Sequence, residues 1–466
     1  MALHFADPPP VSSNGPCSRA GRCLFERPAL IALVFAGLFW LLRSQTYAGD
    51  GDQLVRMIEA GKWLVQTELL SQAILQGAYQ LLHPLGWDGL SVLNLVSCLA
   101  GGAAVAVVIL FMRDHAGADP LWGLGLFCST GFLILCAGHT EYYTLFLATL
   151  LLYGYMGTLY LRRRVSILWV ALAFSLAFWM HMGILFALPS LVVLPVLRDA
   201  KRLGAAQSLL LQAKPLAWGI LPVLMAYGLK EFHDVLGLKI QGLSPTVNFV
   251  PVLSEPGSGQ YYALFDFGHW IDIAYAWAMR SWLLWPMVFI CVGLFGCRTL
   301  WRTDRLFLLI YNLCFMFFIL TWHPNLGMQQ DWDLFSIEAV PTLLLAMTYL
   351  PEWHRSGARR WVLVIAMAAS ISIVLHEVVE RADLQNRGYG RAQVVLEAPT
   401  DSYTLTFDGH AKPLGSIPLR EGHYPVKWID RQHRTKQDAY AVIVPNHATR
   451  LLIQNLPQEN RENQPR

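Results

Sequence analysis

The sequence predicts a mainly α protein, a polytopic transmembrane helical bundle of about 11 spans, followed by a small C-terminal all-β domain. Its composition indicates a membrane: of 466 residues, 55% are hydrophobic and only 14% are charged. A soluble domain carries about 25% charged residues. The apolar residues also form long runs separated by short polar clusters, which is the pattern of helices that cross a bilayer. The alternating pattern of residues 390–457 predicts the β domain.

Four segments follow from these patterns. We expect a disordered cytoplasmic tail, a transmembrane module, a small β-sandwich and a disordered tail, at residues 1–27, 28–380, 390–457 and 458–466. The apolar run that begins at Pro28 has no small-residue cleavage site behind it, so we interpret it as a retained anchor and not as a signal peptide. The predicted spans are 28–43, 89–112, 119–137, 141–161, 165–180, 182–197, 215–231, 275–296, 306–322, 335–350 and 361–377.

Charge and cysteine content exclude several classes of function. The net charge of +3 is too small to favour a nucleic-acid partner. None of the eight cysteines forms a CxxC pair, and the long polar loops contain none. A disulfide framework or a zinc–thiolate site is therefore not expected.

The stretch 165–197 is almost unbroken apolar sequence with an interruption near His181, so it is either one long tilted helix or two short ones. Three arginines precede it at 162–164, and three basic residues follow it within 198–202. Lys and Arg concentrate on the cytoplasmic side of membrane proteins. With both ends inside, the stretch must cross twice, and His181 lies at its outer tip.

The same rule assigns sides to the rest of the chain. The other inner basic residues are Arg19, Arg22, Arg27, Arg113, Lys214, Arg298, Arg302, Arg305, Arg355, Arg359 and Arg360. Every unusual polar motif then falls on the outer face, namely "GDGD" (49–52), "GHTEYY" (138–143), the loop 232–274 and "HPNLGMQQDWDLF" (323–335). We therefore predict one outward-facing site built from several loops, in a multi-pass protein of the inner (plasma) membrane. Its N-terminus is cytoplasmic, and its C-terminal domain is outside, in the periplasm.

The first outer loop contains the acid pair Asp50 and Asp52, and an amphipathic stretch follows over 54–82 that is typical of helices lying on a membrane surface. One reading of the pair is helix capping, in which an Asp satisfies free backbone N–H groups. Two acids around one glycine exceed what a cap requires. A carboxylate pair can also bind a divalent cation or supply a general base.

Single polar residues mark the next two motifs. His139 and Glu141 lie at the outer mouth of a span, where acids are costly and usually functional. The alternative is that Thr140 or Glu141 simply starts the next helix. His181 stands alone in "FWMHMGILF", and a lone histidine is more often structural than functional.

Two further loops complete the candidate set. In the aromatic loop 232–274, which could close over a substrate, His269 and Asp272 lie on one helix face. The alternative is an aromatic belt at headgroup depth. The loop 323–335 contains His323 and a second acid pair, Asp331 and Asp333, which either contact substrate or cap the next helix. We predict substrate-binding roles for His139, Glu141, His181, His269, His323, Asp331 and Asp333.

An acid pair in the first outer loop, interfacial helices behind it and ten or more short, jagged spans resemble the GT-C superfamily of membrane glycosyltransferases. The likeness covers about residues 28–377 and is nearest to the bacterial Rgt and O-mannosyltransferase type. In that superfamily an acid of the first outer loop is base or metal ligand, and a polyprenyl-phosphate sugar is the donor. The resemblance thus gives the catalytic role to Asp50 and Asp52, while the match of "GHTE" to a second contact is positional only.

The resemblance implies an inverting hexosyl or pentosyl transfer. A base takes the proton of an acceptor hydroxyl, that oxygen attacks the anomeric carbon, and polyprenyl phosphate leaves. The partners would be the lipid-linked donor, an envelope glycan, lipid or protein as acceptor, and the bilayer. A divalent cation, Mg or Mn, held by Asp50 and Asp52 is left open as a cofactor. The chain departs from the pattern because no clear basic pair for the donor phosphate stands in an outer loop; the available residues are Arg56, Lys62, Lys239 and Arg280.

The C-terminal segment "FDGHAKPLGSIPLREGHYPVKW" loosely resembles the PEGA-type surface β domain over about 60 residues. That resemblance implies a wall-contact module without chemistry, and an unspecific β cap is the alternative.

Two other classes of protein compete with the enzyme. A multi-pass envelope transporter or flippase usually places its charges near the bilayer midplane and shows internal repeats. Here the acids lie at one edge and no repeat is evident. A scaffold that displays the β domain would need neither a second acid pair nor a long aromatic loop.

Overall fold

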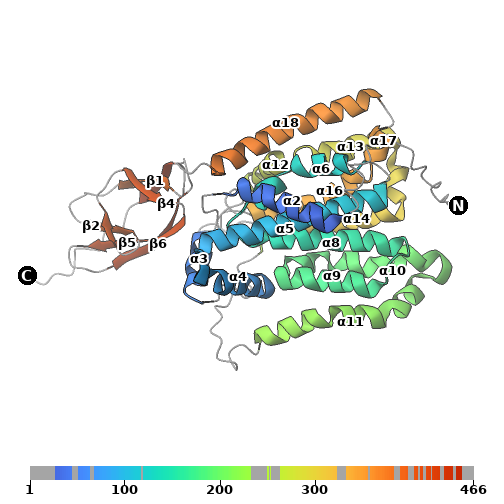
Figure 1. The fold of residues 1–466 in the computed structure, drawn as a ribbon, viewed down its shortest axis with the longest axis horizontal. Coiled ribbons are helices and arrows are strands. Elements are labelled where there is room, and N and C mark those ends of the chain that lie inside the picture. The colour runs from blue at the N-terminus through green and yellow to red at the C-terminus, as the bar shows by residue number, and fades with distance from the viewer. Residues whose placement is uncertain are drawn as a thin grey trace, which may run out of the picture.

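The structure, a computed structural model, is a long helical bundle with β-strands beyond one end (Figure 1). It describes residues 27–44, 51–62, 68–116, 119–231, 249–250, 252, 263–322, 332–354, 357–382 and the seven strands between 389 and 453.

Among the described residues, six helices are long and apolar enough to cross a membrane, and four shorter apolar helices accompany them. The long ones correspond to α5 (Gly89–Phe111), α8 (Tyr143–Leu161), α10 (Leu188–Leu203), α11 (Ala205–Glu231), α14 (Thr303–Thr321) and α18 (Gly357–Ala382). The shorter ones are or contain α2 (Pro28–Leu41), α9 (Ile167–Met180), α13 (Leu284–Phe295) and α16 (Ala339–Met347). The predicted class, a helical membrane bundle, is confirmed.

The remaining described helical elements are short or lie at the ends of the bundle. They are α3 (Gly51–Glu59), α4 (Leu69–Leu82), η1 (His83–Leu85), η2 (Met112–Ala116), α6 (Pro120–Cys128), α7 (Phe132–Cys136), η3 (Met182–Ala187), α12 (Phe267–Arg280), η4 (Cys297–Trp301), α15 (Trp332–Ser336) and α17 (Leu350–His354).

The predicted span 119–137 is not one helix. It is broken into α6 and α7 at Ser129 and Thr130, whose hydroxyls donate back to the carbonyls of Leu126 and Phe127 in competition with the helical pattern. The Ser129 carbonyl, released from the helix, accepts a hydrogen bond from Ser370 of α18. At the break, the Ser129 carbonyl therefore bonds to a neighbouring helix in place of its own.

The stretch 165–197 forms two helices, as its flanking charges indicated. α9 ends at Met180, and His181 is fully extended, with φ of −162° and ψ of 129°, before η3 and α10 begin. An extended residue inside a helical run ends the hydrogen-bond ladder, so the break at His181 is a property of the backbone itself.

Glycines set the closest helix contacts. A Cβ on Gly102 of α5 would lie 2.1 Å from the Ala32 carbonyl oxygen of α2, so the two backbones touch there. Gly154 and Gly157 of α8 similarly meet Leu344 of α16 and Phe307 of α14. Small residues allow such approach in membrane helices, where dispersion replaces the hydrophobic effect as the driving force.

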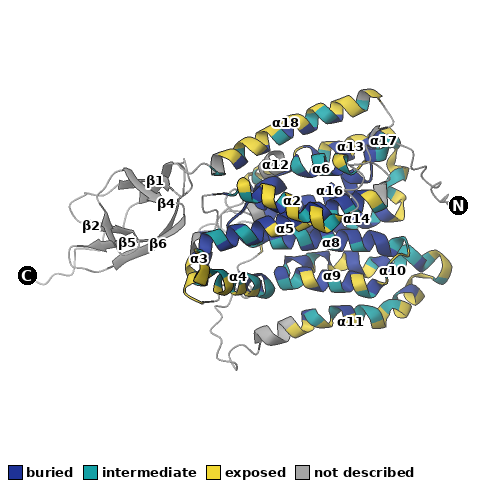
Figure 2. Ribbon diagram, viewed as in Figure 1, coloured by how far each residue is buried: buried dark blue, intermediate teal, exposed yellow. Residues whose placement is uncertain are grey.

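Burial separates a core from a lipid-facing rim (Figure 2). About 72% of the apolar window is buried in the helices of α5 and α8, against 17% in α11 and 28% in α18. The exposed side chains of α11, such as Trp218 and Leu224, are large and apolar. α11 and α18 are therefore the helices that present most surface to lipid.

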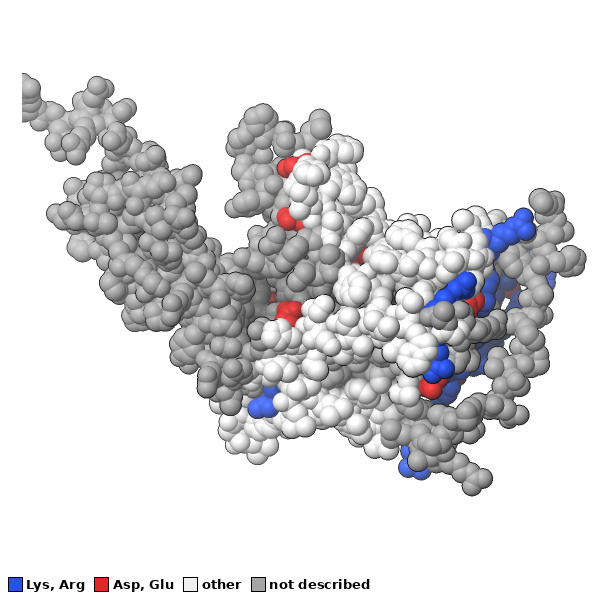
Figure 3. Space-filling model, turned by 90° about the horizontal axis from the view of Figure 1, so that it is seen from above, with Lys and Arg blue, Asp and Glu red and all other residues white. Residues whose placement is uncertain are grey.

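Most Lys and Arg on the face shown in Figure 3 gather at one end of the bundle. We call it the arginine end. Among its residues, Arg162 and Arg302 meet at Asp304, Arg113 and Arg162 meet at Asp114, and Arg198 stacks on Tyr160 near the end of α8. The opposite end, where α3, α4, the start of α8 and His181 lie, is called the motif end.

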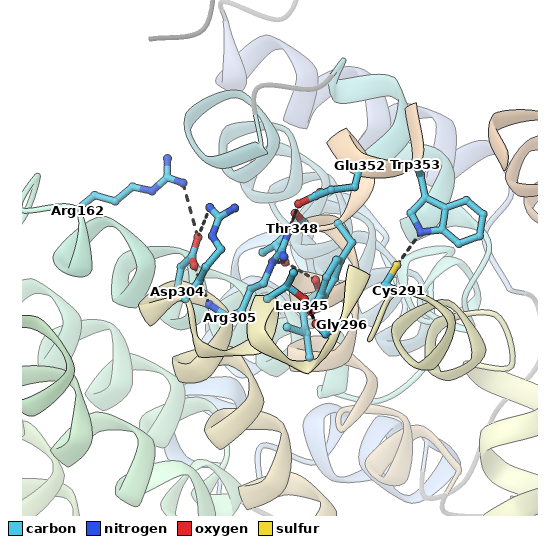
Figure 4. A network of polar contacts seen from close by, with 12 residues as sticks. Arg162, Cys291, Gly296, Asp304, Arg305, Leu345, Thr348, Glu352 and Trp353 are labelled. Carbon is cyan, nitrogen blue, oxygen red and sulfur yellow. Dashed lines mark hydrogen bonds and ion pairs between the residues drawn. The ribbon is translucent and has the colours of Figure 1, made fainter. Parts of the chain in front are cut away.

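The arginine end is held by a polar network (Figure 4). Arg305, with 1% of its side chain exposed, binds the Glu352 carboxylate at 2.6 Å and the Thr348 carbonyl at 2.7 Å, and stacks over the Tyr349 ring. Its neighbour Asp304 faces Arg162 from α8 at 3.9 Å. The network joins α14 to the α16–α17 junction.

The C-terminal segment forms two sheets, which supports a β domain there. One has the order β4 (Ser416–Arg420), β1 (Tyr389–Leu396), β7 (Ala448–Ile453), in which β1 and β7 are parallel. The other is antiparallel, in the order β3 (His410–Lys412), β2 (Tyr403–Phe407), β5 (Gly422–Asp430), β6 (Thr435–Ile443). The PEGA-type assignment stays a prediction.

Candidate functional site

Of the acids and histidines predicted at the site, His139, Glu141, His181 and His269 have described side chains. Asp50, His323 and Asp331 lie outside the described residues. For Asp52 and Asp333 the structure gives only the backbone, in the first turns of α3 and α15.

The first loop meets the "GHTEYY" segment directly. Gly51 opens α3, and a Cβ placed on it would lie 2.3 Å from the Thr140 hydroxyl oxygen and 2.9 Å from the Thr140 carbonyl oxygen. Two motifs that are about 90 residues apart in sequence are thus in contact, with no room for a side chain between them. In the sequence, Gly51 is the residue between Asp50 and Asp52.

Hydrogen bonds fix the chain on either side of that contact. The Ser44 N–H donates to the Ala137 carbonyl at 2.8 Å, and the Ser44 carbonyl accepts from the Asn94 amide at 2.9 Å. From α5, the Ser97 hydroxyl donates to the His139 carbonyl at 2.7 Å. The end of α2 and the turn before α8 are therefore both held by α5, and the first loop starts from a fixed point.

Gly138 makes this approach sterically feasible. Its φ of +72° lies in the left-handed region, and a Cβ there would come within 2.8 Å of the Arg43 Cβ. Glycine alone meets both requirements at low cost. The glycine of "GHTEYY" thus has a structural reason that is independent of chemistry.

The residues that follow are buried at the motif end. His139 is 1% exposed, Thr140 0% and Glu141 7%. α8 begins at Tyr143 with Tyr142 as its N-cap, so neither Thr140 nor Glu141 is the capping residue. A buried carboxylate beside the first loop is costly unless it is paired or used.

His181 belongs to the same region. Its ring lies 4.9 Å from that of Phe146 and 5.7 Å from that of Tyr143, measured between centroids. Its Nε2 lies 3.3 Å from Oε1 of Glu68, a first-loop residue that is 2% exposed. Burial lowers the pKa of His181 to about 4, so the ring is neutral at neutral pH.

His269 lies elsewhere at this level of the bundle. It is fully buried in α12 and its Nε2 lies 3.1 Å from the Leu320 carbonyl at the end of α14. The structure thus brings His139, Glu141 and His181 together with the first loop, while the role of His269 stays a prediction.

Three charged residues that the sequence alone did not single out are buried or half-buried in the bundle. Arg43 ends α2 against Gly138, with its guanidinium stacked on Trp40 and bonded to the Trp40 carbonyl at 3.0 Å. An arginine at the outer end of the first span is an exception to the rule that Lys and Arg concentrate on the cytoplasmic side. That exception could have identified Arg43 from the sequence.

The other two are acids. Glu338 is 1% exposed and accepts a hydrogen bond from the Trp285 indole at 2.9 Å. Glu338 could have been identified from the sequence, because it is an acid inside the predicted span 335–350. Glu68 could not, because it stands among other charges of an amphipathic loop and its partner is more than 100 residues away.

Comparison with known proteins finds similarity in structure alone. No family model and no curated protein sequence matches this chain. A crystal structure of ArnT from Cupriavidus metallidurans bound to undecaprenyl phosphate matches 76% of the chain at 13% identity, with a TM-score of 0.51. The apo structure of that protein matches 75% of the chain at 14% identity, with a TM-score of 0.48.

The match covers 64% of the bound ArnT structure, so the chain spans less than two thirds of the length of that protein. Identity of this order shows a shared fold and nothing finer. The helical module of this chain is a membrane bundle that shares its fold with the bound ArnT structure.

Proposed function

We propose that this chain is a membrane glycosyltransferase that moves a sugar from a polyprenyl-phosphate donor to an envelope acceptor on the outer, periplasmic face. One observation carries the proposal: Gly51, the residue between Asp50 and Asp52 in the sequence, contacts Thr140 in the buried segment that contains His139 and Glu141. The shared fold with ArnT, a protein whose structure contains undecaprenyl phosphate, supports a donor of that class.

The chemistry requires one carboxylate close to the acceptor hydroxyl. That carboxylate removes the proton as the oxygen attacks the anomeric carbon, and the phosphate leaves with the bonding electron pair. Asp52 lies in α3, directly after Gly51, the residue that contacts Thr140. We assign the base to Asp52, and capping or a divalent cation to Asp50.

The leaving phosphate needs positive charge at the same place. Arg43 meets this requirement better than the loop residues considered from sequence, because it stands directly against Gly138 and precedes the acid pair. A guanidinium can contact two phosphate oxygens at once and stabilise the charge that develops on them. We assign the donor phosphate to Arg43.

The test is transfer of radiolabelled sugar in native membranes from a panel of undecaprenyl-phosphate-linked hexoses and pentoses. We expect Asp52→Asn to reduce the rate at least about 100-fold, as loss of a general base does. Asp50→Asn should have a smaller effect, and Arg43→Gln should raise KM for the donor. Asp88→Asn is the matched control, because Asp88 is an exposed acid that caps α5 through Ser91 N–H, and Asn can also cap.

Normal transfer by Asp50→Asn, Asp52→Asn and the double variant would remove the proposed base. Absence of transfer with every donor by the unmodified protein would remove the function itself. The alternative function is a transporter or flippase. Movement of the lipid-linked donor across the membrane of vesicles, without transfer of its sugar, would show that the protein is a transporter.

A further inference from the structure

The first loop is held against the motif end at a second point, which involves Glu68. Glu68 occupies the N-cap position of α4, yet its side chain makes no capping hydrogen bond. It turns instead to His181, at 3.3 Å between Oε1 and Nε2. One turn later, the Ser71 hydroxyl donates to the Met180 carbonyl at 2.9 Å. α4 is thus bound to the break between α9 and η3.

The protonation of His181 follows from its other nitrogen. The Gly183 N–H donates to Nδ1 of His181 at 2.9 Å, so Nδ1 must present its lone pair. A neutral imidazole then has its proton on Nε2. Nε2–H therefore donates to the Glu68 carboxylate, and the same ring has no lone pair left there for a metal ion.

The two holding points enclose the candidate site. Gly51 at the start of α3 touches Thr140, and the Gln76 amide of α4 donates to the Ile58 carbonyl of α3 at 3.1 Å. The His181 ring in turn packs on Tyr143, three residues after Thr140. A closed path of contacts therefore runs from residues 140–143 through His181, α4 and α3 back to Thr140.

We propose that Glu68 and His181 are positioning residues, whose hydrogen bond holds the first loop against residues 138–143 and so fixes where its acid pair meets the substrate. The pair touches no reacting atom in this assignment. It acts through the position of α4 and α3, which sets the geometry for proton removal. The expected effect on the rate of transfer rests on the proposed function. The expected effect on the position of the first loop does not depend on it.

The experiment compares four single variants of the full-length protein in nanodiscs. His181→Phe keeps a ring of similar size among Tyr142, Tyr143 and Phe146 but removes both hydrogen bonds. Glu68→Ala removes the acceptor, and Glu68→Gln keeps one. Ser71→Ala is the matched control, because it weakens the same contact between α4 and α9 without touching the pair.

The first readout is limited trypsin cleavage after Lys62, an exposed residue between α3 and α4. We expect cleavage there to be several-fold faster in His181→Phe and Glu68→Ala, with no further gain in the double variant. Glu68→Gln should cleave like the unmodified protein, and Ser71→Ala, which loses one contact of α4 but keeps the pair, should accelerate cleavage less than Glu68→Ala does. Cleavage after Arg202, at the arginine end, serves as the internal reference. Equal cleavage in all variants, or acceleration by Ser71→Ala alone, overturns the proposal.

The second readout is sugar transfer with whichever donor the unmodified protein uses. We expect kcat to fall about ten-fold in His181→Phe and Glu68→Ala with KM for the donor within two-fold, and Glu68→Gln to restore most of kcat. A change confined to KM, or a Glu68→Gln variant as slow as Glu68→Ala, contradicts a positioning hydrogen bond. If no donor supports transfer, the proposed function fails. The cleavage result still decides whether the contact between Glu68 and His181 holds the first loop in place.

Discussion

At the scale of single residues, the site depends on groups whose partners are distant in sequence. The sequence placed His139 and Glu141 near the first loop through the charge rule, and the structure brings them there. It could not foresee that Glu68 faces His181, since no local pattern couples a residue at the start of one helix to a break 113 residues later. Arg43 was missed for a different reason, because basic residues were read for orientation and not for chemistry.

His181 makes stability depend on pH in a stated direction. Burial lowers its pKa from 6.5 to about 4. The Glu68 carboxylate opposes that shift, whereas the bond from Gly183 N–H, which requires a neutral ring, supports it. A histidine whose folded-state pKa is depressed contributes stability that is complete above pH 6.5 and is lost as pH falls toward 4.

We therefore expect the unmodified protein to lose about 2 kcal/mol through this group between pH 7.5 and 5. His181→Phe lacks the titration and should lose less over that interval. The free energy of unfolding in detergent, measured at both pH values for both proteins, gives the difference. An identical loss in the two proteins would show that His181 does not titrate in this range.

Gly138 offers a second test of geometry at this scale. Gly138→Ala meets both a φ of +72° and the Arg43 Cβ at 2.8 Å, whereas Gly86→Ala meets a φ of +85° with nothing within 4 Å. Backbone strain of about 1–2 kcal/mol is common to both. We expect Gly138→Ala to lose additional stability and most sugar transfer, while Gly86→Ala keeps transfer. Equal effects of the two changes on transfer would mean that the approach of Arg43 to Gly138 is unimportant.

At the scale of elements, apolar periodicity and flanking charge predicted the helices but not their interruptions. Two predicted spans are not single helices: 119–137 divides into α6 and α7, and 275–296 covers the end of α12, a turn at 281–283 and α13. The span 119–137 is broken because Ser129 and Thr130 bond to their own helix and Ser370 satisfies the released carbonyl. The donor of that hydrogen bond, Ser370 in α18, is some 240 residues later in the chain. A prediction from local sequence therefore could not include it.

The Arg305 network allows a prediction about contacts between elements. Glu352→Ala leaves the buried Arg305 guanidinium without its carboxylate, which costs on the order of 3 kcal/mol. The matched change, Asp199→Ala, removes a partner of Arg163, whose side chain is 62% exposed, and should cost less through that pair, about 1 kcal/mol or below. Because Asp199 also contacts Arg198, the exposed pair is isolated by comparing the double variant Arg198→Ala/Asp199→Ala with Arg198→Ala alone. Thermal unfolding of the purified variants compares the two losses, and a Glu352→Ala variant as stable as the control would show that Arg305 finds another partner.

At the scale of the whole molecule, basic residues and polar motifs separate to opposite ends of one bundle. The sequence predicted this separation from charge alone. In the described residues, α5 and α8 both start at the motif end, where Gly89 contacts Glu59 and Tyr143 contacts His181, and both end where Arg162 bonds to the Asp114 carbonyl. The fold supplies the reason that the motifs meet. Short helices and loops at one end converge on α5, whose side chains bind Ser44 and His139 and so connect the first span to the start of α8.

This separation predicts which end faces the cytoplasm. Cys297, in η4 at the arginine end, is exposed, and the other five described cysteines are buried or half-buried. In a variant with Cys17 and Cys23 replaced by Ser, a membrane-impermeant maleimide should label Cys297 only after the membrane of spheroplasts is permeabilised. Asp88→Cys at the motif end should be labelled in intact spheroplasts. Reversed labelling would place the acid pair of the first loop on the cytoplasmic face, where a periplasmic acceptor could not reach it, and the outward site would have to be abandoned even if sugar transfer were observed.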